Sequence, residues 1–455
     1  MLLILFDQDK KREQLVQIII HRGLNQIGGT ITEFRTETSR IFIDMGDNLP
    51  GNGIPLNDEE RQAMVNSFFE NNRRENEAVY YTHGHPDHVG MMALVPRNVK
   101  QYMSEGTRRL LLIKHQTILE GLRLQEKTTD LTLAEIKKNE DIINTLKGMD
   151  TWCLPEGGQQ VPYKETGDIR VSPFYVSHSI YDAYMLLIEA DGKRTLHTGD
   201  YREHGYIGKN LIAMIEKYIG SVDVLITEGT MLKRKERVMS EAEVSKRMEK
   251  LMETFPYTFV LTSSTDIERL ASINKAAKIA NRSLKTCSLM MSRSLDFFTS
   301  LTGLYHKAIY KFKSHESIFP LTPKKVRDMK NGGFVLLCGP NDGAKIEKVM
   351  KMFSEEDTLL IYSCWDGYYK IEEQVENNGR YAAIRNMFMN CVDVHTAGHA
   401  ECKTIERVIN ATQPHDAIIG IHKDADASLT NLNIPDDLKA KIIPENNFLE
   451  WIWVN

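Results

Sequence analysis

Cysteine is scarce in this chain of 455 residues, and membrane-length apolar runs are missing. The six cysteines contain no Cys-x-x-Cys pair, and several lie in or beside apolar strands, which indicates buried free thiols in a reducing compartment. No apolar stretch is long enough for a membrane span, and Asp7 interrupts the apolar start before a signal-peptide core forms. We therefore expect a cytoplasmic protein without a membrane partner.

Internal repeats, low-complexity tracts and linkers rich in Gly, Ser or Pro are also absent from the sequence. The length then favours two or three compact units, and a hydrophobic content of 42% is sufficient for their cores. Residues 1–15 are predicted to precede the first sheet strand, Val16 to Ile20. Residues 102–148 have the apolar period of two or three amphipathic helices, whose Glu and Lys residues form a solvated face.

Charge is unevenly distributed along the chain. The formal net charge is −5, but residues 231–390 contain 26 basic and 19 acidic residues, a charge of +7, which leaves −12 on the remainder. A basic unit beside an acidic one suits an enzyme that attracts phosphates with one part and binds cations with the other. Two solvated faces without a ligand are the alternative. The main basic clusters are Lys233, Arg234, Lys235 and Arg237, and Lys324, Lys325 and Arg327.

Four candidate metal ligands occur within six residues: His83, His85, Asp87 and His88. They follow an apolar segment, Ala78 to Thr82, that reads as a short buried strand, and they precede a predicted helix near residues 89–95. In the extended start of this loop, His83 and His85 can face one metal, while Asp87 and His88, which open the predicted helix, can face another. Imidazole and carboxylate ligands suit Zn²⁺ well and Mn²⁺ less well. A histidine-rich surface loop is the alternative.

Other predicted strands also end in histidine or aspartate. The strand Ile169 to Val176 leads to His178, a hairpin through Asp191 and Gly192 returns to Asp200, and the strand Ala417 to Ile421 ends at His422. A single histidine at a strand end is more often structural than a ligand. Together, however, these ends converge on one edge of a sheet, where α/β proteins place their sites.

This ordered series of motifs resembles that of the metallo-β-lactamase fold. Further matches are Val222 to Gly229, the segment from His395 to Ala400, and His422, which are similar to motifs A, B and C of the β-CASP nuclease branch. Ribonuclease J and the cleavage-and-polyadenylation endonuclease are in that branch. The resemblance covers the chain from about Ile18 onward and implies an αββα sandwich with an inserted α/β β-CASP domain.

By position, the resemblance implies two divalent ions, with Zn²⁺ favoured and Mn²⁺ as the alternative. His83, His85 and His178 would hold one ion, Asp87, His88 and His422 the other, and Asp200 would bridge them. Such a pair lowers the pKa of a shared water, which then supplies hydroxide for in-line attack on phosphorus. We assign catalytic roles to Asp87, to His399 as general acid and to Glu228, which would orient the His399 ring.

Histidine at motif C indicates RNA as the substrate, because the DNA-repair members of the branch usually carry valine there. His395 and Thr396, in the motif B turn, are predicted to contact the scissile phosphate. The ribonuclease J pattern has serine where this chain has Ala397, so one hydroxyl is missing. Ser263, Ser264 and Arg269, at a strand-to-helix turn, are further candidates for a backbone phosphate, although such serines more often cap helices.

The predicted organisation has three segments. Residues 1–230 and 391–455 form the metallo-β-lactamase domain, and residues 231–390 form the β-CASP insertion, which lies as a lid across the metal cleft. Within the insertion we predict strands at Tyr257 to Leu261, Leu284 to Met290, Gly333 to Cys338 and Thr358 to Tyr362, with helices from near Asp266, Asp342 and Ile371. The sequence after His422 leaves no room for the additional C-terminal domain of ribonuclease J. Dimerisation through that domain is therefore not expected, while other homo-oligomeric contacts remain open.

Three alternative functions remain at this stage. The same scaffold serves hydrolases of thioesters and lactones, but these substrates need neither the basic insertion nor His399. A DNA nuclease and a non-catalytic RNA-binding subunit are the others, and the complete set of seven ligands argues against a non-catalytic protein. No organic cofactor is implied. The RNA substrate and the choice between internal cleavage and trimming from a 5′ end are not determined.

Overall fold

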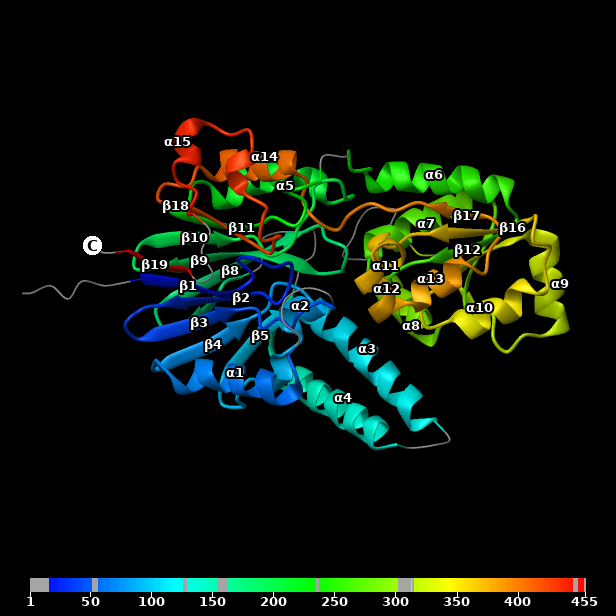
Figure 1. Cartoon of the computed structure of the whole chain (residues 1–455), viewed down its shortest axis with the longest axis horizontal. Helices are drawn as coiled ribbons and strands as arrows, with labels where there is room; N and C mark the ends of the chain where they lie inside the picture. Colours follow the sequence, from blue (N-terminus) through cyan, green and yellow to red (C-terminus); the bar gives the residue numbers. More distant parts are fainter. Residues whose placement is uncertain are drawn as a thin grey trace, which may run out of the picture.

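Two β-sheets packed face to face form one half of the molecule, and a third sheet forms the other half (Figure 1). The computed structural model describes residues 16–50, 56–125, 129–153, 162–234, 237–301, 312, 315–444 and 449–453. The predicted extension at residues 1–15 and Lys235 of the first basic cluster lie outside the described residues. Among the described residues, no helix is long and apolar enough to cross a membrane.

The first sheet joins the two ends of the described chain, because its edge strand β19 pairs with β1. Its strands, in order across the sheet, are β19 (Leu449–Trp453), β1 (Val16–Arg22), β2 (Ile31–Arg35), β3 (Ser39–Ile43), β4 (Asn76–Tyr80), β5 (Lys100–Ser104) and β6 (Asp150–Trp152). The outer face of this sheet is covered by α1 (Asp58–Glu70), α3 (Glu105–Arg123) and α4 (Asp130–Gly148). The sequence predicted two or three helices in the region 102–148, and the described residues of this region form two, α3 and α4.

The second sheet lies against the first through a shared apolar layer, to which Tyr80, Leu186 and Ile226 contribute. Its strands, in order, are β18 (Ala417–Ile421), β11 (Val224–Glu228), β10 (Lys193–His197), β9 (Ala183–Ala190), β8 (Ile169–Val176) and β7 (Lys164–Thr166). Its outer face is covered by α5 (Leu211–Met214), α14 (Cys402–Thr412) and α15 (Asp436–Lys439). Since both faces of the sheet are covered, strands such as β11 and β18 are buried at every residue and do not alternate between buried and exposed positions. The predicted αββα sandwich is confirmed.

The third sheet belongs to the inserted unit and is parallel throughout. Its strands, in order, are β14 (Glu316–Ser317), β13 (Ser283–Thr286), β15 (Phe334–Cys338), β12 (Tyr257–Leu261), β16 (Thr358–Tyr362) and β17 (Cys391–Asp393). One face is covered by α6 (Glu241–Thr254), α7 (Ile267–Ile279) and α8 (Leu289–Ser300), and the other by α9 (Pro323–Gly332), α10 (Gly343–Met350) and α13 (Arg380–Arg385). The last strand lies just past the predicted boundary at Asn390.

Two predicted elements differ from the structure. The strand predicted from Leu284 to Met290 is wrong at its end: β13 stops at Thr286, and Ser288 caps the following helix by accepting a hydrogen bond from the Met291 amide. A short apolar run does not distinguish a strand from a buried helix. The helix predicted near residues 89–95 is instead α2 (Pro86–Val89), followed by a 3₁₀ turn at Met92–Leu94.

Candidate metal centre

The candidate metal ligands follow the carboxyl ends of strands that share one direction. In the second sheet β10, β11 and β18 are parallel, and Glu228 pairs in register with Ile421. Strand β8 is antiparallel to β9, which is antiparallel to β10, so the end of β8 reaches the same edge. Asp200, Glu228, His178 and His422 therefore meet where the strands end, as the sequence predicted.

The first triad consists of His83, His85 and His178, and their ring nitrogens face one another. Nδ1 of His85 lies 3.1 Å from Nε2 of His83 and 3.0 Å from Nε2 of His178. Ligand atoms of all three residues fall within 4.8 Å of one another. Burial lowers the pKa of His83 and His178 well below the usual value, and that of His85 to about 4. The three imidazoles are therefore neutral, which is the form that binds a metal.

The second triad consists of Asp87, His88 and His422, whose ligand atoms also lie within 4.8 Å of one another. Oδ2 of Asp87 is 3.0 Å from Nε2 of His422 and 3.8 Å from Nε2 of His88. Burial alone would raise the pKa of Asp87, but the two histidines outweigh it and lower the pKa to about 2. The carboxylate is ionised and suited to a cation.

Oδ2 of Asp200 lies between the two triads. It is 3.7 Å from Nε2 of His83 and of His178, 3.2 Å from Nε2 of His88 and 3.6 Å from Nε2 of His422. Burial opposes ionisation of this carboxyl, but His422 and His88 lower its pKa well below the usual range. One ionised oxygen is thus near the ligand nitrogens of both triads.

The donor set fits divalent metal ions. Nε2 of His88 is buried and makes no hydrogen bond, although Asp200 is near it. An imidazole nitrogen buried without a hydrogen-bond partner is costly in a protein interior unless another ligand binds it. Five histidines and two carboxylates match the ligands of Zn²⁺ and Mn²⁺ sites. The residues that are present therefore suit the two ions that the fold family implies.

Several of the ligand histidines are fixed through their second ring nitrogen. Nδ1 of His83 is 3.0 Å from Oγ1 of Thr82, Nδ1 of His178 is 2.7 Å from the Gly398 carbonyl oxygen, and Nδ1 of His422 is 2.8 Å from Oγ1 of Thr230. Such contacts set the orientation of a ligand ring and its basicity.

Asp44 completes this outer layer, and the sequence analysis did not identify it. Its Oδ2 lies 2.7 Å from Nδ1 of His88, and it accepts hydrogen bonds from the amide and hydroxyl of Thr82. Burial would lower the pKa of His88, but Asp200 and Asp44 together raise it well above the usual value. Asp44 directly follows the apolar strand β3, so the strand-end signal that found the other ligands was present here too.

His399 and Glu228 form a pair beside the triads. Oε2 of Glu228 is 2.9 Å from Nδ1 of His399, and Oε1 of Glu228 accepts hydrogen bonds from the amides of Tyr201 and Ala400. Burial lowers the pKa of His399, but Glu228 and then Asp200 outweigh it and raise the pKa to about 9. His399 keeps 21% of its side chain exposed while Glu228 is fully buried, so the imidazole is the partner that can reach a substrate.

Close backbone packing holds the loop that carries the second triad. A Cβ on Gly46 would lie 1.7 Å from the Asp87 carbonyl oxygen, so only glycine fits at this position. On either side of it, the Met45 amide donates to the His88 carbonyl and the Asp47 amide to the Pro86 carbonyl. The segment after β3 and the short helix α2 are thereby joined.

The candidate phosphate contacts are not among the clustered ligand atoms. The prediction that Arg269 contacts a backbone phosphate is wrong, because Arg269 is buried and its donors are already bound. It forms an ion pair with Glu241 at 2.9 Å, and it donates hydrogen bonds to Oγ of Ser363 and to the Thr396 carbonyl oxygen. Ser263 is exposed and Ser264 half-buried, and Ser263 Oγ contacts Oγ1 of Thr265 rather than capping α7.

The other two candidates lie in the motif B turn. His395 is half-buried, and its Nδ1 accepts a hydrogen bond from Arg269. Burial and then the Arg269 charge lower the pKa of His395 to about 3, so the ring is neutral. The Thr396 hydroxyl donates to the Met239 carbonyl at 2.5 Å, which occupies its hydrogen.

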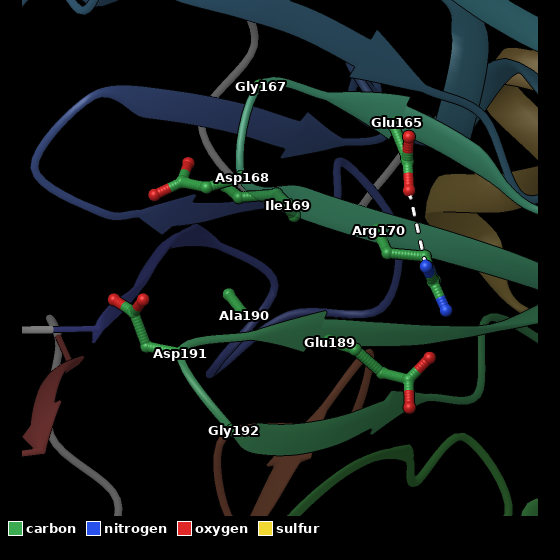
Figure 2. Close-up of a pocket in the computed structure, with 9 residues that line it drawn as sticks. All are labelled: Glu165, Gly167, Asp168, Ile169, Arg170, Glu189, Ala190, Asp191 and Gly192. Carbon is green, nitrogen blue, oxygen red and sulfur yellow. Dashed lines mark hydrogen bonds and ion pairs between the residues drawn. The ribbon is translucent and has the colours of Figure 1, made fainter.

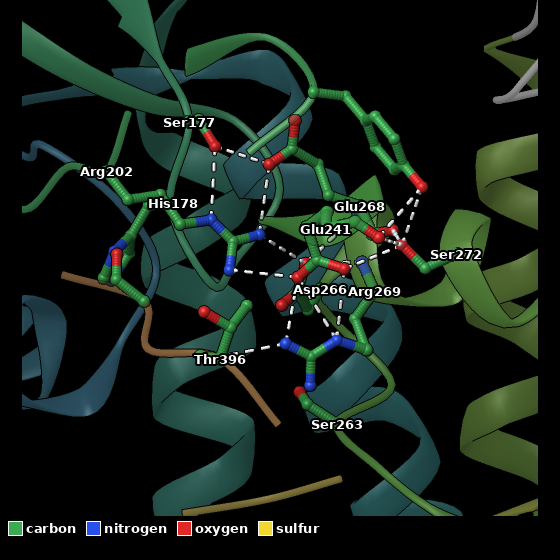
Figure 3. A network of polar contacts seen from close by, with 12 residues as sticks. Ser177, His178, Arg202, Glu241, Ser263, Asp266, Glu268, Arg269, Ser272 and Thr396 are labelled. Atoms are coloured by element: carbon green, nitrogen blue, oxygen red, sulfur yellow. Dashed lines mark hydrogen bonds and ion pairs between the residues drawn. The ribbon is translucent and has the colours of Figure 1, made fainter. Parts of the chain in front are cut away.

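A buried network of charges joins the inserted unit to the sandwich behind these ligands (Figure 3). Arg202, two residues after Asp200, pairs with Glu241 at 3.3 Å, with Asp266 at 3.3 Å and with Glu268 at 3.1 Å. Ser177, one residue before His178, donates to Glu268. The side chains next to two metal ligands are therefore bound to helices α6 and α7 of the insertion.

A hollow elsewhere on the surface is not part of this centre (Figure 2). It is lined by the turns at Gly167 and Asp191 and by acidic side chains that include Glu165 and Glu189. These turns precede β8 and follow β9, so the hollow lies at the opposite end of β8 from His178. An acidic surface hollow of this kind supplies no imidazole ligands.

Comparisons with known proteins agree with this geometry. Residues 61–262 match the model of the β-lactamase superfamily domain. Ribonuclease J of Thermus thermophilus is 24% identical over 88% of this chain and 67% of its own length, and ribonuclease J of Mycoplasma genitalium is 21% identical over 92% and 70%. A crystal structure of a protein of unknown function from Enterococcus faecalis V583 superimposes with a TM-score of 0.69 at 18% identity, covering 96% of this chain and all of that one.

These similarities cover most of the chain, and they agree with the two packed sheets and with the ligands gathered at their common edge. Residues 61–262 thus match a β-lactamase superfamily domain, and most of the chain is similar to ribonuclease J.

Proposed function

We propose that this protein is a ribonuclease that depends on two divalent metal ions and hydrolyses phosphodiester bonds in RNA. The observation that carries the proposal is the position of Asp200 Oδ2, within 3.2 to 3.7 Å of ligand nitrogens in both triads. A shared carboxylate is characteristic of two-metal hydrolytic sites. RNA as the substrate is supported by the relatives, which carry the name ribonuclease J.

In this proposal the first triad holds one ion, the second triad holds the other, and Asp200 is shared. Zn²⁺ is the ion that the histidine-rich first triad favours, and Mn²⁺ suits the mixed second triad as well. When bound, the pair supplies Lewis acidity and a water of lowered pKa, the nucleophile for attack on phosphorus. The proton that the leaving oxygen needs must then come from a side chain of the protein.

His399 is the group we assign to proton transfer. Glu228 accepts the Nδ1 proton of the ring at 2.9 Å, which leaves Nε2 to carry the proton that the leaving oxygen of the RNA needs. Since Glu228 and Asp200 favour the imidazolium, the proton is present at neutral pH. Glu228 is a positioning residue, because it acts on the substrate only through His399.

The test uses purified full-length protein supplied with Zn²⁺ or Mn²⁺, and RNA and DNA strands of matched sequence labelled at either end, with a 5′-monophosphate or a 5′-hydroxyl. We expect metal-dependent cleavage of RNA, and a loss of about 10²- to 10⁴-fold in His399→Ala, the usual contribution of a general acid. The product ladder separates internal cleavage from trimming.

The matched control is His415→Ala, because His415 is exposed and lies near Asp223, outside the metal centre. This variant should cleave at the rate of the parent. Intact RNA in the presence of either metal contradicts the proposal. Hydrolysis of a thioester or lactone under the same conditions would then support the small-molecule hydrolase. Cleavage of DNA but not of RNA would support the DNA nuclease.

A further inference from the structure

Three aromatic side chains of the inserted unit pack together at its edge facing the sandwich. Tyr368 stacks on Tyr381, with ring centroids 4.4 Å apart and planes 17° from parallel, and Trp365 meets Tyr368 edge to face at 5.3 Å. All three residues are half-buried. They lie on or beside α11 (Gly367–Lys370) and α13, and α11 stands at the sandwich side of the inserted unit (Figure 1). We refer to Trp365, Tyr368 and Tyr381 as the aromatic platform.

The platform lies next to the metal centre. The Asp87 carboxylate is near enough to the phenol of Tyr368 to add to the increase in its pKa, which burial mainly causes. Behind the platform, α12 (Glu372–Asn378) contacts the sandwich: Gln374 donates a hydrogen bond of 2.6 Å to the Pro50 carbonyl oxygen. Leu49, one residue earlier, packs near Gly28 in the loop that also approaches Asp87. The rings therefore flank the side of the site that carries the second triad.

Two arginines border the rings. The Arg234 guanidinium carbon lies 6.0 Å from the Trp365 ring centroid, and the Arg380 charge acts on both Tyr368 and Tyr381. Arg234 and Arg380 are exposed, and within the described part of the chain neither forms an ion pair with a carboxylate. By contrast, neighbouring Lys233 and Arg237 are paired with Asp426 and Glu243. Arg380 instead donates a hydrogen bond of 2.9 Å to Oδ1 of Asn341, and Arg234 is close enough to Asp366 to help lower the pKa of that carboxyl, after Lys370.

The indole of Trp365 is held in place before any ligand arrives. A Cβ on Gly367 would lie 2.3 Å from a ring carbon of Trp365, so the indole lies directly on this glycine. The Tyr362 hydroxyl donates to the Trp365 carbonyl at 3.0 Å and fixes its backbone. A ring that is already ordered loses little conformational entropy when a planar ligand stacks on it.

We propose that the aromatic platform is a stacking site for the bases of single-stranded RNA that enters the metal centre, with Arg234 and Arg380 contacting the adjoining phosphates. Aromatic rings beside unpaired arginines bind single strands through base stacking and phosphate contacts, without dependence on sequence. The inference rests on the proposed ribonuclease function and adds to it a way of selecting unpaired strands. Arg234 belongs to the first basic cluster of the sequence, but neither that cluster nor the motif series pointed to the aromatic rings.

The test measures binding of full-length, metal-loaded protein carrying His399→Ala, so that the RNA is not cut. Fluorescence anisotropy gives Kd for a labelled ten-nucleotide RNA and for an abasic strand of the same length and charge. We expect the RNA to bind about 10- to 100-fold more tightly than the abasic strand, the range for one or two stacked bases. Trp365→Ala and Tyr368→Leu should bring this ratio close to 1, Gly367→Ala should lower it by displacing the indole, and Trp365→Phe should retain most of it.

Tyr163→Leu is the matched control, since Tyr163 is an exposed ring under the Arg170 guanidinium on another part of the surface, and it should leave the ratio unchanged. If the His399→Ala protein binds the RNA and the abasic strand with equal Kd, the proposal that the platform stacks bases is wrong. This outcome does not depend on whether any platform variant folds. If protein with His399 intact cleaves RNA while the two Kd values are equal, the stacking proposal is wrong and the proposed ribonuclease function is retained. If the protein neither binds nor cleaves RNA, both fail.

Discussion

At the scale of single residues, the second ring nitrogen of a ligand histidine explains much of the site. His83, His178 and His422 are fixed by Thr82, by the Gly398 carbonyl and by Thr230, and His88 is held by the carboxylate of Asp44. A carboxylate behind a ligand imidazole makes it a stronger ligand and fixes its tautomer. Among the groups that fix the ligand histidines, Asp44 is therefore the one whose loss should weaken metal binding most.

Asp44→Asn should weaken binding of one of the two ions about 10- to 100-fold, because the amide keeps the shape of the side chain but not its charge. Competition with a zinc chelator measures the affinity. The matched control is Asp168→Asn, since Asp168 lies in the surface hollow away from the ligands. An affinity equal to that of the parent in Asp44→Asn would show that this contact does not support the metal.

At the scale of elements, two loops of the first sheet depend on one another. The loop after β3 contains Gly46, and the loop after β4 contains Asp87, and there is no space between them for a side chain. The ligands of the second triad are therefore positioned by backbone contact as much as by their own strand.

Gly46→Ala should shift the α2 loop, reduce the free energy of unfolding by about 1 to 3 kcal/mol through overpacking, and weaken binding of the metal held by the second triad. Urea unfolding and metal content measure the two effects. Gly121→Ala is the control: nothing lies within 4 Å of that position in α3, so alanine should leave metal content unchanged and raise stability slightly. Full metal content and unchanged unfolding in Gly46→Ala would contradict the packing argument.

The buried network between the lobes gives an element-level prediction about pH. Glu241 begins α6, is fully buried and pairs with Arg269 and Arg202. Burial opposes its ionisation, but the two arginines lower its pKa from 4.5 to about 2. Its ionised form therefore stabilises the fold fully above about pH 4.5, and this contribution is lost as the pH falls toward 2.

Glu241→Gln should reduce the free energy of unfolding by about 3 to 5 kcal/mol at pH 7, since two arginines lose a buried partner. The difference in the free energy of unfolding between Glu241→Gln and the parent protein should become smaller as the pH is lowered from 4.5 toward 2. Urea unfolding at several pH values provides the measurement. A difference that does not change over this range would mean that the Glu241 charge is not what stabilises the junction.

Much of the fold and the ligand set followed from the sequence because the information is local. Strands such as β8 and β18 are largely apolar and have a ligand within two residues of their ends, and these ends must meet because the strands share one direction. Asp44 was missed although it has the same pattern, because no histidine accompanies it in the sequence. The error at Leu284 to Met290 arose because no Gly or Pro marks the boundary between β13 and α8.

What the sequence did not reveal depends on contacts between elements that are separate in the chain. Arg269 looked like a phosphate ligand because it stands in the first turn of α7, but Glu241 and Thr396 from other segments occupy it. The aromatic platform likewise forms only when Tyr381 of α13 stacks on Tyr368 of α11, which Trp365 contacts edge to face. Such pairings between distant segments leave no periodic signal in a single sequence.

At the scale of the whole molecule, the two lobes are joined directly behind the metal centre. Arg202 and Ser177 lie next to ligands of the sandwich and bind carboxylates of the insertion, and Gln374 of the insertion contacts the loop after β3. The insertion is thus bonded to the sandwich beside the centre. The proposed function requires that the centre holds two ions that share Asp200.

The most direct test is the number of metal ions per chain, measured by plasma mass spectrometry after the full-length protein is loaded with Zn²⁺ and desalted. The account predicts two ions in the parent protein, and fewer than one tightly held ion in Asp200→Asn, because that carboxylate faces both triads. A parent protein that retains one ion or none, or an Asp200→Asn variant that retains two, would contradict it.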